Sequence, residues 1–278
     1  MPHRKHSFRT RATIALGVVA VGCAVLASSA LAVYPNSMSA TGDSITRAFN
    51  SCSPAFTDCP ANSWATGTNA SVNSFYNRIL AANPAIRGNA FNDAVSGARM
   101  SSLPGQTTTA AGHRVEYVTI EMGANDVCTS SEATMTSVAN FRRDFETSIN
   151  NLRTRLPSAR ISVGSIPDVY WLWSLFTADR TATSTWNALR VCQSMLANPT
   201  SRARADEDRR RNVQQRSIDF NRVLSDVCAT YTQCKFDRNI AFNYHFRTSE
   251  VSTNDYFHPS LTGQTTIASI EWGQTWVF

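Results

Sequence analysis

The sequence predicts a three-layer α/β fold built on a central parallel sheet of about five strands. Short apolar runs alternate along the chain with longer segments in which apolar residues recur every three or four positions. The runs are typical of buried strands, and the longer segments are typical of helices with one apolar face. Because parallel strands need long crossover connections, this alternation favours helices packed against one sheet.

Five runs are expected to form the strands. The third, Glu116–Met122, alternates apolar and polar residues, and the fourth is stopped by Pro167, which has no backbone N–H to donate to a strand ladder. The complete set is Ser37–Gly42, Asn89–Ala94, Glu116–Met122, Arg160–Ile166 and Ile240–Tyr244.

Four segments are expected to be helices: Ser71–Ala82, Val138–Leu156, Arg204–Tyr231 and Leu261–Trp272. In the second, Phe141, Phe145 and Ile149 recur at four-residue spacing and so share one face. The third begins among arginines that are interleaved with acidic residues between positions 202 and 211. This mixture predicts a solvated, salt-bridged helix face rather than a phosphate-binding site.

The amino terminus has the pattern of a secretory signal peptide. A basic head with Arg4 and Lys5 precedes an apolar stretch over residues 14–26, and Ala30-Leu31-Ala32 fits the small-x-small pattern before a signal-peptidase cut. The apolar stretch is short for a membrane anchor. A lipoprotein signal at Cys23 is the alternative, and the apolar sequence that continues after Cys23 argues against it. We expect cleavage near Ala32 and a secreted protein.

Residues 33–278 are expected to form a single domain, because no internal repeat or low-complexity linker divides them. Removing residues 1–32 lowers the formal net charge from +6 to about +2, since four basic residues and no acid are lost. The remaining charge gives no reason to expect a nucleic-acid partner.

Six cysteines remain after Cys23 is removed, and an even number in an exported chain predicts three disulfides. Six cysteines allow fifteen pairings, and the sequence does not choose among them. Pairs Cys52–Cys59 and Cys228–Cys234 would close short local loops and leave Cys128–Cys192 as a long-range link. No C-x-x-C spacing occurs, which argues against a structural zinc site.

Four segments follow predicted strands or lie near the carboxyl terminus, and each carries a residue suited to acyl transfer. The first is Gly42-Asp43-Ser44-Ile45, where Ser44 could act as a nucleophile, although Asp-Ser is also an ordinary helix cap. In the second, residues 92–98, the backbone N–H of Gly97 could face an oxyanion. The third is Gly123-Ala124-Asn125-Asp126, in which Asn125 could donate its amide, and turns are the ordinary explanation for both segments.

The fourth segment is Asp255-Tyr256-Phe257-His258-Pro259. A carboxylate three residues before an imidazole can hold its tautomer and stabilise the imidazolium, provided that the backbone turns between them. His258 is therefore the expected general base, and Asp255 is expected to orient it. The other histidines that survive maturation, His113 and His245, are expected to have no catalytic role.

In order, these segments resemble the first, second, third and fifth sequence blocks of the GDSL, or SGNH, hydrolase superfamily, which includes bacterial lipases and esterases. The four letters of SGNH fall on Ser44, Gly97, Asn125 and His258, and the blocks span residues 42–259. Ile45 departs from the leucine of the family name, a small change at a packing position. The resemblance implies the flavodoxin-like SGNH-hydrolase fold. No Gly-x-Ser-x-Gly motif occurs to indicate an α/β-hydrolase elbow.

The resemblance also implies a mechanism. His258, oriented by Asp255, takes the proton of Ser44 as it attacks an ester carbonyl. The oxyanion is held by the N–H groups of Ser44 and Gly97 and by the amide of Asn125. Water then hydrolyses the acyl-enzyme, and no metal or other cofactor is needed.

The substrate is predicted less directly. An aromatic loop over residues 167–176 follows the fourth run, and Trp171, Trp173 and Phe176 are expected to line an acyl groove, with core packing as the equal alternative. Residues 64–67, Trp-Ala-Thr-Gly, resemble the phospholipase-B-like branch and place lipid or phospholipid esters first. Carbohydrate-ester deacetylation is second, and a non-catalytic secreted binding protein is third. We expect a monomer that meets a small-molecule or lipid ester and transiently contacts a lipid surface.

Overall fold

The computed structural model describes residues 1–4, 34–276 and 278, and the fold lies in the part from Tyr34 onward. Five parallel strands form one sheet in the order β2-β1-β3-β4-β5. The predicted parallel sheet is therefore confirmed. The strands are β1 Met38–Gly42, β2 Ala90–Asn92, β3 Tyr117–Glu121, β4 Arg160–Val163 and β5 Cys234–Phe236. The predicted signal peptide lies outside the described residues, apart from residues 1–4.

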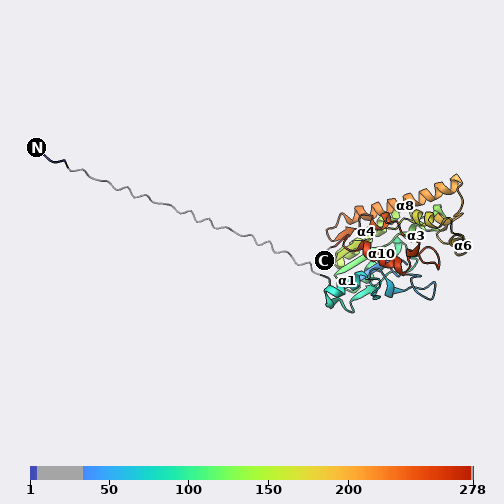
Figure 1. The fold of residues 1–278 in the computed structure, drawn as a ribbon, viewed down its shortest axis with the longest axis horizontal. Helices are drawn as coiled ribbons and strands as arrows, with labels where there is room; N and C mark the ends of the chain where they lie inside the picture. Colours follow the sequence, from blue (N-terminus) through green and yellow to red (C-terminus); the bar gives the residue numbers. More distant parts are fainter. Residues whose placement is uncertain (5–33, 277) are drawn as a thin grey trace. The chain divides into compact units, whose positions relative to one another are not determined.

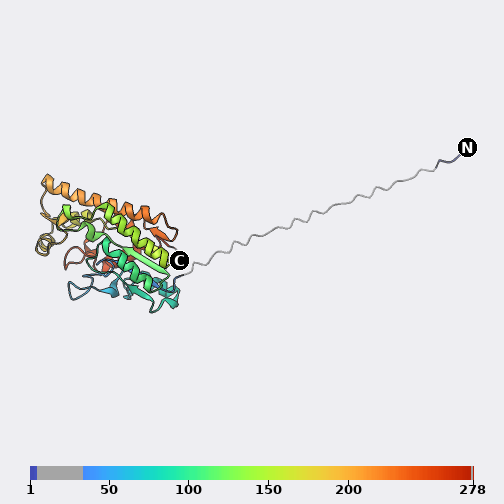
Figure 2. The ribbon, with the colours of Figure 1, turned by 180° about the vertical axis from the view of Figure 1, so that it is seen from behind.

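Helices cover both faces of this sheet and give the three layers that the sequence predicts. In Figure 1, α1 and α10 lie in front of the sheet, and the view from behind in Figure 2 shows α2, α4 and α8 on the opposite face. Every residue of β1 and β3 is buried, as expected for central strands covered on both sides. The helices are α1 Phe75–Ala82, α2 Leu103–Gly112, α3 Ala124–Val127, α4 Val138–Arg155, α5 Val169–Phe176, α6 Arg180–Leu189, α7 Gln193–Leu196, α8 Arg204–Cys228, α9 Ile240–Asn243 and α10 Leu261–Glu271.

Serine side chains start three of the expected helices. Ser74, Ser137 and Ser260 each accept the backbone N–H of the residue three positions later, which satisfies one of the free donors at a helix start. The four predicted helices are present, although α1 begins only after the Ser74 cap and not at residue 71.

The predicted fifth strand, Ile240–Tyr244, is wrong. The edge strand is Cys234–Phe236, and Ile240–Asn243 forms α9. The Asp237 carboxylate accepts the backbone N–H groups of Asn239 and Ala241, at 2.9 and 3.4 Å, and so starts the helix. A short apolar run fits a strand and one turn of buried helix equally well, and here the neighbouring aspartate decides.

Three disulfides are present, as the sequence predicts: Cys52–Cys59, Cys128–Cys192 and Cys228–Cys234. Two of them close loops with sequence separations of 7 and 6. The third, with a separation of 64, ties the residue after α3 to the residue before α7.

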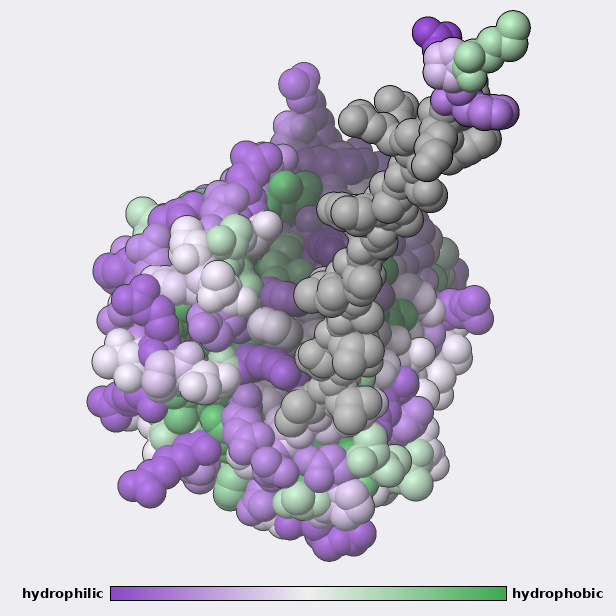
Figure 3. Space-filling model, turned by 90° about the vertical axis from the view of Figure 1, so that its left-hand side faces the viewer, coloured by the Kyte–Doolittle hydropathy of each residue, from purple (hydrophilic) through white to green (hydrophobic). Residues whose placement is uncertain are grey.

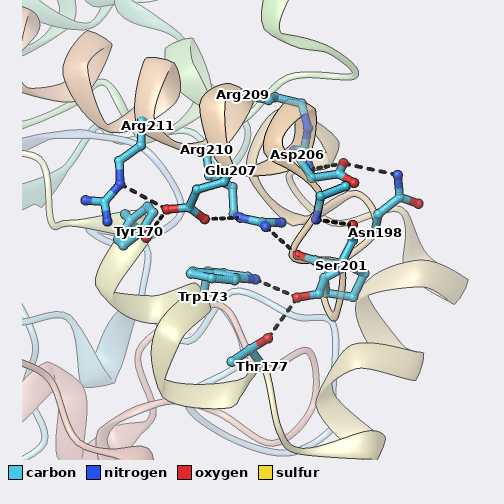
Figure 4. A network of polar contacts seen from close by, with 12 residues as sticks. Tyr170, Trp173, Thr177, Asn198, Ser201, Asp206, Glu207, Arg209, Arg210 and Arg211 are labelled. Carbon is cyan, nitrogen blue, oxygen red and sulfur yellow. Dashed lines mark hydrogen bonds and ion pairs between the residues drawn. The ribbon is translucent and has the colours of Figure 1, made fainter.

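The arginine-rich start of α8 differs from the solvated face predicted for it (Figure 4). Arg210 is fully buried, stacks 4.2 Å above the Trp173 ring of α5 and donates to the Ser201 carbonyl at 2.6 Å. Its ion-pair partner Glu207 also accepts the hydroxyl of Tyr170 from α5 at 2.5 Å. The predicted ion pairs form, but part of this face is an internal contact that holds α5 against α8, because the negative π face of the Trp173 ring attracts the Arg210 cation.

Most of the surface shown in Figure 3 is hydrophilic, with hydrophobic residues scattered over it. In the described part of the chain, the most exposed large hydrophobic side chains beyond Met1 are those of Phe56, Val95 and Leu189. None of the helices described there has both the length and the apolar character to cross a membrane.

Candidate active site

The sheet brings the four candidate segments to one edge. Residues 43–45 follow β1, residues 93–98 follow β2 and residues 122–126 follow β3, and these three strands are neighbours in the sheet. Their carboxyl ends meet at the edge where open α/β sheets place their sites. The fourth segment, Asp255–Pro259, reaches this edge just before α10. The Val251–Pro259 bridge and the bond from the Ser252 N–H to the His258 carbonyl close residues 251–259 into a tight loop.

A continuous line of hydrogen bonds joins Ser44, His258 and Asp255. The Oγ of Ser44 lies 2.8 Å from Nε2 of His258, and Nδ1 of His258 lies 2.6 Å from Oδ2 of Asp255. The Phe49 and Phe257 rings lie 4.9 and 5.2 Å from the imidazole and limit its movement. This is the geometry in which an imidazole can remove a proton from a hydroxyl while a carboxylate stabilises the resulting cation.

The Asp255 carboxylate is held by the turn that follows it. Its Oδ1 accepts the backbone N–H groups of Phe257 and His258, and Tyr256 turns the chain with a φ of 55°. Burial by itself would raise the pKa of Asp255, but hydrogen bonds and charge from His258 outweigh burial and lower that pKa. Asp255 is therefore anionic at neutral pH, as a partner of an imidazolium must be.

The turn that carries Ser44, residues 42–46, permits only glycine at its first position. Gly42 has a φ of 149°, and a Cβ there would lie 2.2 Å from the Glu121 carbonyl oxygen. The Gln106 side chain binds both backbone groups of Gly42, accepting its N–H at 2.8 Å and donating to its carbonyl at 2.9 Å. The turn is thus clamped from β3 and α2, which fixes where the Ser44 hydroxyl points.

The other two sequence-predicted residues lie at the same edge, and their roles as oxyanion donors stay predictions. The Nδ2 of Asn125 donates to the Ala98 carbonyl at 3.0 Å and lies 3.4 Å from the Asp43 carboxylate. Gly97, with a φ of 78°, is exposed beside Ala98. The bond from Asn125 therefore connects the second and third segments.

Sequence reasoning missed a pair of buried carboxyl groups beneath Ser44. Burial raises the pKa of Asp43 to about 6, although the Ile45 N–H that binds the carboxylate acts in the opposite direction. Burial and the adjacent Asp43 raise the pKa of Glu121 well above its usual range. Within the described residues no N–H or hydroxyl group binds the Glu121 oxygens, and its carboxyl bonds to Asp43 instead. Glu121 is therefore protonated, and its carboxyl O–H donates a hydrogen bond to the Asp43 carboxylate.

A second pair repeats this arrangement on the far side of Gly164. Burial and Asp237 raise the pKa of Glu271 well above its usual range. A Cβ at Gly164 would lie 3.3 Å from Oε1 of Glu271 and 3.7 Å from Cγ of Glu121, so the backbone at Gly164 passes close to both glutamates. In the described residues, no group of three or more His, Cys, Asp or Glu side chains is arranged to hold a metal ion.

An apolar cleft opens beside Ser44 and His258 and encloses about 660 Å³, counting the solvent at its mouth. The start of α5 lines one part of it, and Phe246, Glu250, Val251 and residues 257–259 line another. Trp171 lines this cleft, where its ring stacks on His245 at 4.0 Å and its Nε1–H donates to the Phe246 carbonyl at 2.8 Å. We call this space the apolar cleft. Its lining side chains include Ile45, Val169, Trp171, Leu172, Phe246, Val251 and Phe257.

Two of the three aromatic residues predicted to line a groove do not reach the cleft. Trp173 and Phe176 are buried in the core, and Trp173 donates to the Pro199 carbonyl at 2.8 Å. The predicted aromatic loop is wrong because Asp168 caps a helix there, accepting the N–H of Tyr170. A helix points residues 171 and 173 in different directions, so only Trp171 faces the cleft.

The sequence matches the family model of the GDSL-like lipases and acylhydrolases over residues 39–270. No curated protein sequence matched the chain. An extracellular lipase from Streptomyces rimosus is 14% identical, with 84% of this chain and 97% of that chain covered and a TM-score of 0.49. A phospholipase A1 from Streptomyces albidoflavus is 17% identical, with coverages of 82% and 94% and a TM-score of 0.45. A family 3 carbohydrate esterase from Clostridium thermocellum is 11% identical, with coverages of 86% and 94% and a TM-score of 0.46.

Glu121→Gln tests the buried carboxyl pair through the pH dependence of stability. A carboxyl whose pKa is higher in the folded than in the unfolded protein makes the free energy of unfolding fall as pH rises from its unfolded to its folded pKa. The amide keeps a donor for Asp43 but does not titrate. We therefore expect Glu121→Gln to raise the free energy of unfolding at pH 7–8 and to flatten its decline above about pH 4.5, as measured by denaturant titrations.

Glu146→Gln serves as the control, since the Glu146 carboxyl is open to solvent. Its free energy of unfolding should depend on pH in the same way as that of the wild type. A contrary result would be a Glu121→Gln variant that is less stable than the wild type at pH 8 and whose free energy of unfolding declines with pH as steeply as that of the wild type. It would show that Glu121 is ionised in the folded protein.

Proposed function

From the family of GDSL-like lipases and acylhydrolases, to which this chain belongs, we propose that the protein hydrolyses carboxylic esters with Ser44 as nucleophile. The family match makes it an ester hydrolase. The observation that supports these particular residues is the hydrogen-bonded line Ser44–His258–Asp255, with distances of 2.8 and 2.6 Å.

In the proposed reaction, Nε2 of His258 takes the Ser44 proton as Oγ attacks the ester carbonyl. The imidazolium then gives this proton to the leaving alcohol, and an acyl group remains on Ser44. A water molecule, deprotonated by His258, attacks the acyl carbonyl, and the proton returns to Ser44 as the acid leaves. Asp255 stays anionic throughout and stabilises the imidazolium in both halves.

The developing oxyanion needs donors that are already in place. We propose the backbone N–H groups of Ser44 and Gly97 and the side-chain amide of Asn125. The Asn125 amide has two N–H bonds, and the bond to the Ala98 carbonyl uses one of them. The second is held only by the 3.4 Å contact with Asp43 and is therefore available to a substrate.

Lipid or phospholipid acyl esters are the substrate class that we propose. The cleft beside Ser44 is lined by aliphatic and aromatic side chains, and its two acids, Asp168 and Glu250, are bound to neighbours of their own. Each methylene buried there is worth roughly 0.8 kcal/mol, so a cleft that takes several favours long acyl chains strongly. An acetyl group on a sugar would leave most of this surface in water.

We also propose that the protein is secreted as one domain over residues 33–278 and acts as a monomer at a lipid surface. The three disulfides support this location, since they persist in oxidising compartments.

Ser44→Ala should lower the hydrolysis of a soluble nitrophenyl ester by about 10³-fold or more, because the attacking oxygen is lost. The buried site loses only one hydroxyl, so the melting temperature should change by a few degrees at most. Ser63→Ala, which alters another buried serine whose Oγ accepts the Ala65 and Thr66 N–H groups, is the control and should stay active. Near-wild-type turnover by Ser44→Ala would remove Ser44 from the mechanism.

Trp171→Ala tests the proposed acyl specificity. With its part of the wall removed, turnover of an octanoyl or longer ester should fall about tenfold relative to turnover of the acetyl ester, the equivalent of one or two lost methylene contacts. The measurement is kcat/KM across nitrophenyl esters of increasing chain length.

Trp173→Ala is the matched control from the same helix, because its ring is buried away from the cleft. It should lower the melting temperature and leave the ratio of long-chain to acetyl activity unchanged. A uniform loss for Trp171→Ala on every chain length would contradict the lipid proposal and favour a carbohydrate ester.

A further inference from the structure

Asn50 is a buried side chain that binds the acid of the candidate triad from behind. Its Nδ2 donates to Oδ2 of Asp255 at 2.6 Å, the same oxygen that binds Nδ1 of His258. Its own Oδ1 accepts the backbone N–H of Phe56 at 2.5 Å. Only 3% of Asn50 is exposed, so water does not replace these bonds easily.

The backbone of Asn50 makes two further bonds to the same two parts of the molecule. Its N–H donates to the Thr57 carbonyl at 3.0 Å, and its carbonyl accepts the Ser252 hydroxyl at 2.8 Å. The residue has a φ of 63°, a conformation that asparagine tolerates better than most residues. Asn50 thus joins residues 56–57 to the segment that carries Asp255.

Residues 56 and 57 belong to a short loop closed by the Cys52–Cys59 disulfide, which we call the Cys52–Cys59 loop. Asp58 of this loop binds Arg47 at 3.0 Å and the Ser96 hydroxyl at 2.5 Å. The loop is therefore held at its ends by the disulfide and at Asp58 by Arg47 and Ser96, which belong to the segments that follow β1 and β2. It presents the Phe56 N–H in a defined direction.

This direction decides which way the Asn50 amide faces. The two ends of an amide are nearly identical in shape, and only hydrogen bonds select its orientation. A backbone N–H can only donate, so Phe56 requires the oxygen of Asn50, and the NH₂ group must face Asp255. With the amide reversed, its oxygen would face the anionic carboxylate and repel it.

We propose that Asn50 is a positioning residue through which the Cys52–Cys59 loop orients the Asp255 carboxylate toward His258. The proposal rests on the proposed ester hydrolysis. Asp255 receives two backbone donors on Oδ1 and two side-chain donors on Oδ2, and of these four donors only the Asn50 amide comes from outside residues 255–258. Loss of this donor leaves a carboxylate that turns more freely and concentrates more negative charge on His258.

Two variants separate the two ends of the amide. Asn50→Ala removes both the donor to Asp255 and the oxygen for the Phe56 N–H. Asn50→Asp keeps an oxygen for the Phe56 N–H, and at a pH where its carboxyl is ionised it replaces the donor by a like charge. We expect kcat to fall about tenfold for Asn50→Ala and about 100-fold for ionised Asn50→Asp, with KM changed less than about twofold, because one hydrogen bond to a charged group is lost. The acid limb of the kcat/KM profile should move to higher pH in both.

The exposed Asn73, whose φ is 50°, provides the matched control, and Asn73→Asp should keep both kcat and the pH profile. Replacing Cys52 and Cys59 by alanine tests the loop. This change should lower kcat several-fold in the wild type and have little further effect in Asn50→Ala, as expected for two changes that act through one contact.

Unchanged kcat and an unmoved pH profile in Asn50→Ala, with the wild type active, would overturn the proposal and leave Asn50 a loop contact. A loss of melting temperature with an unmoved acid limb would overturn it equally. If the wild type hydrolyses no ester, the proposed function fails first, so the two failures are distinguishable.

Discussion

The imidazole of His258 must bond at the same time to a hydroxyl at the end of the first strand and to a carboxylate near the end of the chain. Ser44 and His258 are 214 residues apart in sequence, so this contact joins the two ends of the domain. Gln264 of α10 secures it, accepting the Trp64 N–H at 2.9 Å and donating to the Ile45 carbonyl at 2.8 Å. Through this one side chain the last helix is fastened directly to the turn that carries Ser44.

The same requirement explains the polar groups buried around this edge. Gln106 clamps Gly42, Asn50 binds Asp255, and the Glu121–Asp43 pair lies beneath the nucleophile. Burying carboxyl groups is unfavourable, and a protein keeps such groups when their hydrogen bonds hold a geometry that packing alone would not define. These buried carboxyl groups therefore lower the stability of the fold at the edge where the side chains of the site must be held in place.

Much of this arrangement could be predicted from the sequence, and the failures have identifiable causes. The runs around β1 and β3 are continuous and buried, and the residues that follow them set the positions of Ser44 and Asn125. The strand at Cys234–Phe236 was missed because Lys235 is exposed and the run is short, whereas Asp237 turns the more apolar residues 240–243 into a helix. Trp173 could not be told from Trp171 without knowing that Asp168 caps a helix. Nothing in the sequence around Asn50 predicts its role, since that role depends on a contact with Asp255, which is 205 residues away in the sequence.

The most direct test of the account is covalent labelling by a fluorophosphonate followed by peptide mapping with mass spectrometry. Such a probe reacts with a serine only where a neighbouring base has activated its hydroxyl. The line from Asp255 through His258 to Ser44 predicts a single adduct, on Ser44, that does not form after His258→Ala. An adduct on a different serine, or ester hydrolysis that continues at full rate with Ser44 unmodified, would contradict it.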